Sequence, residues 1–193
     1  TIKDYSFSQR LQTFGTALPN KTKSFRIKKS NLLAPVQLNK QVKKGDIIAK
    51  LKTENIIAPF DGVLGERGLS DDVLVSESSI ILTLDDSSII LSDLKVPETY
   101  APLMKNGLPI EATFSGQENK IYSGKIDSVA SRINADTRSL LVRIKILNDN
   151  FELIPGSLLE VSIKYNERNS LGVPDTGVIF EGNKTYVYKL IEN

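Results

Sequence analysis

An internal repeat constrains this 193-residue chain more than any other feature. Residues 32–35 read Leu-Leu-Ala-Pro, and residues 56–59 read Ile-Ile-Ala-Pro. Residues 42–51 then recur as residues 75–84, with a valine, a small turn residue, two isoleucines and a leucine at matching positions. The second copy carries extra residues around positions 62–70. Since each copy can bury its apolar face only against the other, the repeat predicts a flattened sandwich of two four-strand halves.

Alternation of apolar and polar residues predicts that most of the chain forms β-strands. In residues 140–147, Leu140, Val142, Ile144 and Ile146 fall on one face, which should point into a core. The other face carries Leu141, Arg143 and Lys145. One short helix is expected over 98–105, because Pro97 precedes it and Gly107 follows it.

Composition removes several classes of function. The chain contains no cysteine and no histidine, which excludes Ser–His and Cys–His nucleophilic catalysis and leaves no thiolate or imidazole ligand for a metal. No apolar run approaches the ~20 residues of a membrane helix. We therefore expect no catalytic residue, no metal site and no cofactor, and any signal peptide or membrane anchor should lie upstream of Thr1.

Charge is distributed unevenly along the chain. Residues 1–50 hold eleven Lys or Arg and two Asp or Glu, whereas the remainder holds fourteen basic and twenty-one acidic residues. This pattern fits either a basic face toward an anionic partner or an ordinary solvated strand surface. Nucleic acid is not expected as a partner, because the basic pairs lack the interleaved aromatic residues on which bases stack.

Three local patterns suggest chemistry but are better explained as structure. The pairs Asp71-Asp72 and Asp85-Asp86 are expected to be turn carboxylates, since adjacent strand residues point to opposite faces and cannot converge on a site. The glycine-rich residues 62–68 are expected to form a β-turn, because neither Lys-Ser/Thr nor a helix follows them. Tyr186 and Tyr188 are expected to be half-buried.

The repeat resembles the biotinyl/lipoyl-type domain, which occurs in two kinds of protein. In carrier domains of this type, the modified lysine sits at the hairpin between the two halves. Lys52 falls at that place, but neither of the flanking methionines of a biotin carrier is present. A carrier with Lys52 as its attachment site is therefore one alternative.

The second alternative covers nearly the whole chain. Five segments resemble those of the membrane fusion proteins and follow one another in the order typical of that family. These proteins are the periplasmic adaptors of RND-type tripartite efflux pumps. The most specific segment is Ile-Ala-Pro-Phe-Asp-Gly-Val at 57–63. The others lie at 42–51, 96–107, 128–143 and 153–156.

The resemblance implies a layout in which the middle of the chain forms a tip. Residues 24–86 would form the lipoyl-like sandwich, and residues 11–23 with 87–165 a six-stranded β-barrel with one short helix. Residues 1–10 with 166–193 would form part of a membrane-proximal β-domain. Most adaptors carry an α-helical hairpin between the lipoyl halves, but only residues 52–55 occupy that place here, so no α-helical hairpin is expected.

The resemblance also implies a function and its partners. The chain would be a non-enzymatic adaptor in the periplasm, held at the inner membrane by an anchor outside this chain. It would bridge an inner-membrane RND-type transporter and a TolC-like outer-membrane channel, and self-associate as a hexamer. The candidate partner-binding residues lie at the lipoyl tip and in the barrel: Lys52, Thr53, Glu54, Arg132, Arg138 and Arg143.

Overall fold

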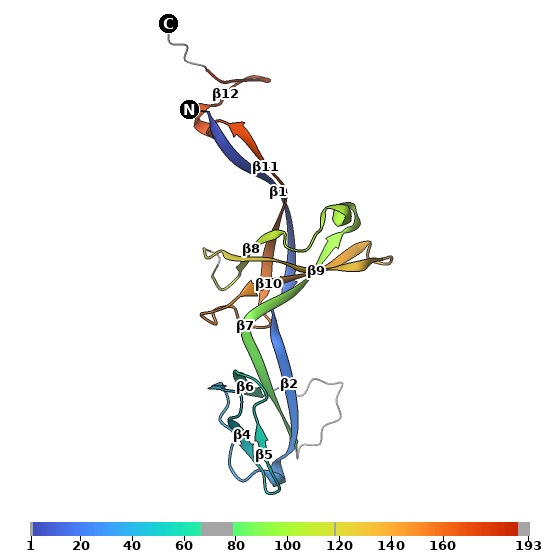
Figure 1. The fold of residues 1–193 in the computed structure, drawn as a ribbon, viewed down its shortest axis with the longest axis vertical. Helices are drawn as coiled ribbons and strands as arrows, with labels where there is room; N and C mark the ends of the chain where they lie inside the picture. Colours follow the sequence, from blue (N-terminus) through green and yellow to red (C-terminus); the bar gives the residue numbers. More distant parts are fainter. Residues whose placement is uncertain (1, 67–78, 118, 189–193) are drawn as a thin grey trace.

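The computed structural model describes residues 2–66, 79–117 and 119–188 of the chain. They form an elongated β-protein in which both chain ends lie at one extremity (Figure 1). The helical segments are three short 3-10 helices: η1 (Lys29–Asn31), η2 (Glu98–Leu103) and η3 (Asp175–Gly177). The strands are β1 (Lys3–Thr16), β2 (Leu18–Lys28), β3 (Lys40–Val42), β4 (Ile47–Lys50), β5 (Asn55–Ile57), β6 (Gly62–Glu66), β7 (Ser79–Pro97), β8 (Pro109–Phe114), β9 (Tyr122–Asn134), β10 (Ser139–Leu147), β11 (Leu158–Gly172), β12 (Ile179–Glu181) and β13 (Lys184–Tyr186).

One antiparallel sheet of nine strands runs through most of the molecule, in the order β1-β11-β8-β9-β10-β7-β6-β3, with β2 also paired to β7. The 19-residue β7 belongs to both parts of the molecule, since its first half pairs with β6 and its second half with β10. The mainly β fold class is thus confirmed. No α-helical hairpin occurs in the part of the chain that the structure describes.

The larger hydrophobic core lies between six strands that follow one another in the sheet: β1, β11, β8, β9, β10 and β7. The predicted faces of β10 are confirmed, because Leu140, Val142, Ile144 and Ile146 are buried. On the opposite face, Arg143 is exposed. An alternating strand buries one set of side chains when a core covers only one of its faces.

The predicted six-stranded barrel is not closed. Closure would require β1 to pair with β7, but their described residues form no ladder of backbone hydrogen bonds. A side-chain hydrogen bond does link them, from Thr13 Oγ1 to the Lys95 carbonyl at 3.3 Å. Strand β2 pairs with β7 only as far as Leu91, and β1 does not continue that ladder along the second half of β7. Strand β1 instead packs over β7 at Gly15, where a Cβ atom would lie 2.3 Å from Ser92 Oγ.

The smaller core belongs to the lipoyl-like part. Its buried residues come from β2, β3, β4, β6 and β7, together with the loop after β5. The four-stranded sheet β2-β7-β6-β3 accompanies the separate two-stranded sheet of β4 and β5. The described residues therefore do not form the expected two equal halves of four strands each. Val75 and Ser78, which belong to the second copy of the repeat, lie outside the described residues. The division of the chain at residues 24 and 86 stays a prediction.

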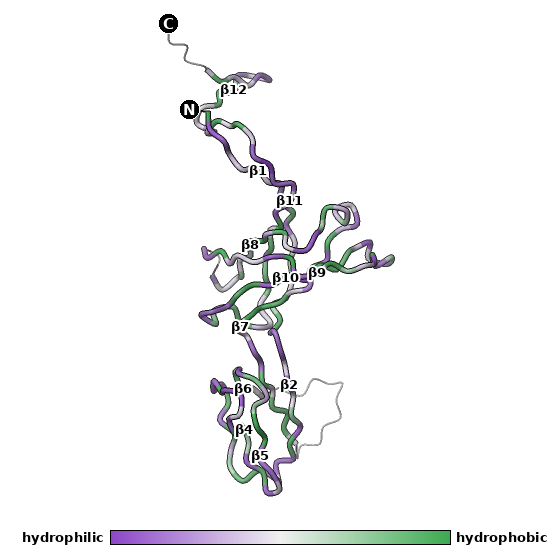
Figure 2. Tube along the Cα trace, viewed as in Figure 1, coloured by the Kyte–Doolittle hydropathy of each residue, from purple (hydrophilic) through white to green (hydrophobic). Residues whose placement is uncertain are grey.

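The third part is a thin ribbon made by the outer ends of β1 and β11 (Figure 1). Its register shifts between Phe7 and Gln9, opposite Asn166, whose φ is +49°. The residues around this register shift are mostly hydrophilic (Figure 2). The small β12–β13 hairpin follows, and Tyr186 and Tyr188 are exposed there rather than half-buried as expected, because the described residues place no core against them.

Three local expectations need correction. The helix after Pro97 is a 3-10 helix ending at Leu103, because Pro102 lies inside it and lacks the backbone donor that an α-helix needs. Asp85 and Asp86 lie within β7 rather than in a turn, where they accept hydrogen bonds from Thr22 and Asn20 of the paired strand β2. The glycine-rich segment begins strand β6, while Asp71, Asp72 and Gly68 lie outside the described residues.

A group of three charged side chains links β1, β11 and β8 where the ribbon enters the barrel. Glu111 on β8 accepts from Lys164 Nζ at 2.5 Å and from Arg10 Nη1 at 2.9 Å, and these two cations are register partners on β11 and β1. The hydrogen bond from Lys164, helped by the charges of Lys164 and Arg10, holds the pKa of Glu111 below its usual value of 4.5. The carboxylate therefore stabilises the fold in its ionised form.

This geometry predicts a pH-dependent stability difference. Because the folded pKa of Glu111 is lowered, its contribution is complete above pH 4.5 and disappears as the pH falls through the lowered value. Glu111→Gln should lower the free energy of unfolding by about 1 kcal/mol at pH 7 and by much less at pH 3. Urea unfolding of both proteins at the two pH values measures this. An equal difference at both would show that the charge of Glu111 contributes nothing.

Candidate partner-binding surfaces

The outer half of the β9–β10 hairpin projects from the barrel on the same side as η2 (Figure 1). Its turn is shaped by Asn134, whose Oδ1 accepts the backbone N–H groups of Asp136 and Thr137, each at 3.0 Å. The turn closes at Arg138, whose φ is +47°. A positive φ is uncommon for a residue with a side chain, so this turn holds Arg138 in a defined orientation at some conformational cost.

Arg138 links the hairpin to η2 but remains largely exposed. The backbone N–H of Glu98 donates to the Arg138 carbonyl at 3.0 Å, and Arg138 Nη1 lies 3.6 Å from Glu98 Oε2. The Arg138 side chain is 73% exposed. A long, exposed ion pair of this kind contributes little to stability, so the guanidinium is available to a second carboxylate.

Arg143 differs from Arg138 because it already has a close partner. Its Nε and Nη2 donate to the two carboxylate oxygens of Asp93 on β7, each at 2.7 Å. The hydrogen bond from Arg143 holds the pKa of Asp93 below its usual range, and the same bond raises the pKa of Arg143. This bidentate pair ties β10 to β7 from the outside of the barrel.

The structure places Arg132 on β9 near the hairpin turn, where it is exposed. Two apolar side chains missed as candidates lie on the same hairpin, Ile133 and Leu141, which are 38% and 45% exposed. The sequence already held the signal for Leu141, since this leucine falls on the polar face of an alternating strand. Exposed aliphatic groups beside arginines are typical of protein-binding surfaces.

Lys52, Thr53 and Glu54 form the turn between β4 and β5 at the opposite extremity from the chain ends (Figure 1). All three are exposed. The turn is fixed through its backbone, because Leu51 N donates to the Glu54 carbonyl and Lys52 N to the Asn31 carbonyl, each at 2.9 Å. The six candidate residues therefore belong to two separate surfaces, the β4–β5 turn and the β9–β10 hairpin.

Part of this chain is similar to proteins of known family. Residues 93–167, which include η2 and the whole β9–β10 hairpin, match the family model for the CusB-like β-barrel domain. SilB of Salmonella typhimurium, a protein named as a membrane fusion protein, is 24% identical over 68% of this chain and 31% of its own length. The cation efflux system protein CusB of Escherichia coli is 22% identical over 67% of this chain and 32% of its own length.

The chain is a relative of the membrane fusion proteins. This confirms the resemblance inferred from the sequence motifs. It spans about a third of the length of SilB and CusB.

Two solved structures share the fold of this chain. ZneB from Cupriavidus metallidurans aligns with a TM-score of 0.63 at 12% identity, covering all of this chain and 81% of its own. A MacA–MexA chimeric protein that contains the α-hairpin domain of Pseudomonas aeruginosa MexA aligns with a TM-score of 0.67 at 17% identity, covering all of this chain and 94% of its own. These likenesses establish the common β architecture and nothing further.

No helix among the described residues has the length and apolar character needed to cross a membrane.

Proposed function

We propose that this membrane fusion protein relative is the β-domain body of a periplasmic adaptor. It bridges an inner-membrane RND-type transporter and a TolC-like outer-membrane channel in a tripartite multidrug efflux pump. An anchor outside the chain holds it to the inner membrane. It acts as a scaffold, without catalytic residues or a cofactor, and the transporter supplies the energy for export.

The observation that carries this proposal is the linear order of the parts. A ribbon with both chain ends, a CusB-like barrel domain and a lipoyl-like tip follow one another along one axis (Figure 1). Such an order separates two binding surfaces by the length of the molecule, as a bridging protein requires. In this proposal the barrel and ribbon contact the transporter, and the β4–β5 turn points toward the channel.

Six copies around a common axis would form the duct. Side-to-side contacts repeated in a closed ring multiply weak pairwise interfaces, so no single contact needs to be tight. The exposed hairpin with Arg132, Arg138 and Leu141 is the surface that we assign to these contacts or to the transporter. The experiment is deletion of the gene, which should raise sensitivity to exported compounds, and its reintroduction, which should restore resistance. Unchanged sensitivity after deletion would refute the proposal.

A carrier function remains the alternative, because Lys52 is exposed in the hairpin where a carrier lysine would lie. The two functions differ in the mass of the native protein. Purification from its own host followed by intact-mass measurement should give the unmodified mass. An added biotinyl or lipoyl group on Lys52 would favour the carrier.

A further inference from the structure

Two segments, residues 28–33 and 50–55, form the outer end of the lipoyl-like part, at the extremity away from the chain ends (Figure 1). Together they are called the tip surface below. A backbone hydrogen bond from Leu33 N to the Lys50 carbonyl, at 2.9 Å, joins them in addition to the bond from Lys52 N described above. The fold therefore fixes the two backbones relative to each other.

The tip surface carries an excess of positive charge. It holds four lysines, all of them exposed, at positions 28, 29, 50 and 52. Glu54 is the only acidic residue in the two segments. None of the four lysines forms an ion pair with another residue that the structure describes. The sum of these charges is a cationic surface at one extremity of an elongated molecule.

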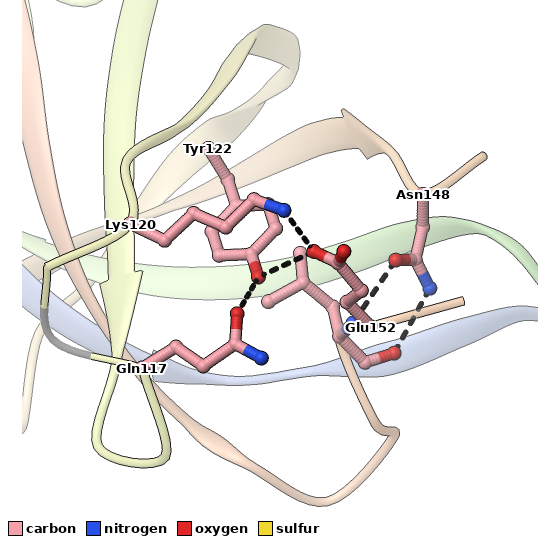
Figure 3. A network of polar contacts seen from close by, with 6 residues as sticks. Gln117, Lys120, Tyr122, Asn148 and Glu152 are labelled. Carbon is pink, nitrogen blue, oxygen red and sulfur yellow. Dashed lines mark hydrogen bonds and ion pairs between the residues drawn. The ribbon is translucent and has the colours of Figure 1, made fainter. Parts of the chain in front are cut away.

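Two exposed cations of the barrel have counter-charges close by. Lys120 forms an ion pair with Glu152 (Figure 3), and Arg143 forms the bidentate pair with Asp93 described above. The lysines of the tip surface lack such partners among the described residues, and like charges gathered on one surface repel one another. An anionic partner would relieve this repulsion on binding.

The apolar content of the tip surface distinguishes a protein partner from a lipid one. Leu33 is 62% exposed and is the one exposed large apolar side chain of the two segments. A single apolar residue with charges around it matches the apolar centre and polar rim of a protein interface. Binding to a bilayer depends on a larger apolar area, and an anionic bilayer would also repel Glu54.

We propose that the tip surface binds an acidic protein surface, on which Asp and Glu side chains surround an apolar contact for Leu33. This inference rests on the proposed function, because it names what the β4–β5 turn would recognise on the outer-membrane channel. Lysine ammonium groups form charge-assisted hydrogen bonds with carboxylates. Opposite charges on the two surfaces also speed their encounter and fix their orientation.

The test places a photoreactive amino acid at Thr53 in cells and measures the yield of crosslinked protein. Lys29→Glu combined with Lys52→Glu should lower that yield about tenfold, and Lys29→Gln combined with Lys52→Gln about threefold. Both lysines are exposed and their printed hydrogen bonds involve backbone atoms, so these variants should fold, which thermal unfolding checks. Mass spectrometry should map the adduct to a peptide of net negative charge.

Lys43→Glu combined with Lys44→Glu is the matched control. These two exposed lysines belong to the same part of the molecule, but their backbone N–H groups donate to the carboxylates of Asp46 and Asp61, at 2.9 and 2.7 Å. The control should leave the crosslinking yield unchanged. The proposal is overturned if the control lowers the yield as much as the double Lys29 and Lys52 reversal does, or if the adduct peptide carries no excess of acidic residues.

Two outcomes separate this proposal from the adaptor function. If position 53 captures the channel and the charge reversal leaves the yield unchanged, the adaptor function stands and this inference fails. If position 53 captures a different acidic protein, and capture depends on Lys29 and Lys52, the inference stands and the adaptor function fails. Cosedimentation of the purified protein with phosphatidylglycerol vesicles tests the lipid alternative. Vesicle binding that the charge reversal removes, with no protein captured from position 53, overturns the proposal.

Discussion

Gly62→Val should lower the free energy of unfolding by about 3 kcal/mol, which corresponds to a fall in melting temperature of roughly 10 °C. Gly62 is the first residue of β6 and lies beside the backbone of Asp85 in β7. A Cβ atom at position 62 would lie 2.6 Å from the Asp85 carbonyl oxygen and 3.0 Å from its carbonyl carbon. Backbone atoms cannot rotate away as a flexible side chain can, so β6 and β7 must separate.

The reason for this glycine differs from the one that its sequence context suggests. A glycine just after Pro-Phe-Asp looks like a turn residue that needs a positive φ. Gly62 is not among the glycines with positive φ, which are Gly45, Gly107, Gly156 and Gly182. The constraint is the contact between two strands, which no local pattern reveals.

Lys52→Ala is the matched comparison for Gly62→Val. Lys52 is exposed in the β4–β5 turn, and its backbone bonds do not depend on its side chain. The substitution should change the free energy of unfolding by less than about 0.5 kcal/mol. Thermal unfolding by circular dichroism measures both variants. Equal melting temperatures would mean that β6 can shift away from β7 without cost.

Arg138→Asp should abolish efflux in cells while leaving the protein folded. The Arg138 side chain is largely exposed, and aspartate tolerates the positive φ of this position better than most residues. Among the described residues Arg138 pairs with Glu98 alone, at a long distance, so stability should change by about 0.5 kcal/mol or less. At an interface, a reversed charge that meets a carboxylate costs several kcal/mol.

The measurement is paired: thermal unfolding of the purified variant, and drug resistance in a strain that lacks the native gene. Lys125→Asp makes the same charge change on β9, away from the hairpin turn, and should preserve resistance. Arg138→Asn removes the charge without adding a carboxylate and should give an intermediate loss. If Arg138→Asp unfolds the protein, Arg138 is structural. If the variant folds and still supports efflux, the hairpin is not the interface assigned to it.

Local patterns predicted the features that depend on a single strand or turn. The buried face of β10 follows from its alternation, because the core covers only one side of that strand. The position of η2 follows from Pro97 and Gly107, whereas its 3-10 character depends on Pro102 inside the helix. The family resemblance rests on short motifs in a fixed order, and the match over residues 93–167 confirms it.

Features that depend on how distant strands meet could not be predicted. The barrel stays open because β1 packs over β7 at Gly15 and does not continue the ladder that β2 forms as far as Leu91, and nothing in β1 itself indicates this. Arg143 and Arg138 looked alike in sequence, but only Arg143 has a carboxylate of β7 within bidentate reach. The positive φ of Phe151 follows from the hydrogen bonds of buried Asn148, which join two segments about sixty residues apart. The functional roles of the six candidate residues stay predictions.

The proposed bridging role requires the β4–β5 turn and the β9–β10 hairpin to contact different partners. Photo-crosslinking in cells tests it directly, with a photoreactive amino acid placed at Thr53 in one strain and at Arg138 in another. Position 53 should capture an outer-membrane channel protein, and position 138 should capture an inner-membrane transporter or a second copy of this chain. Capture of one and the same partner from both positions, or of a soluble enzyme from position 53, would contradict it.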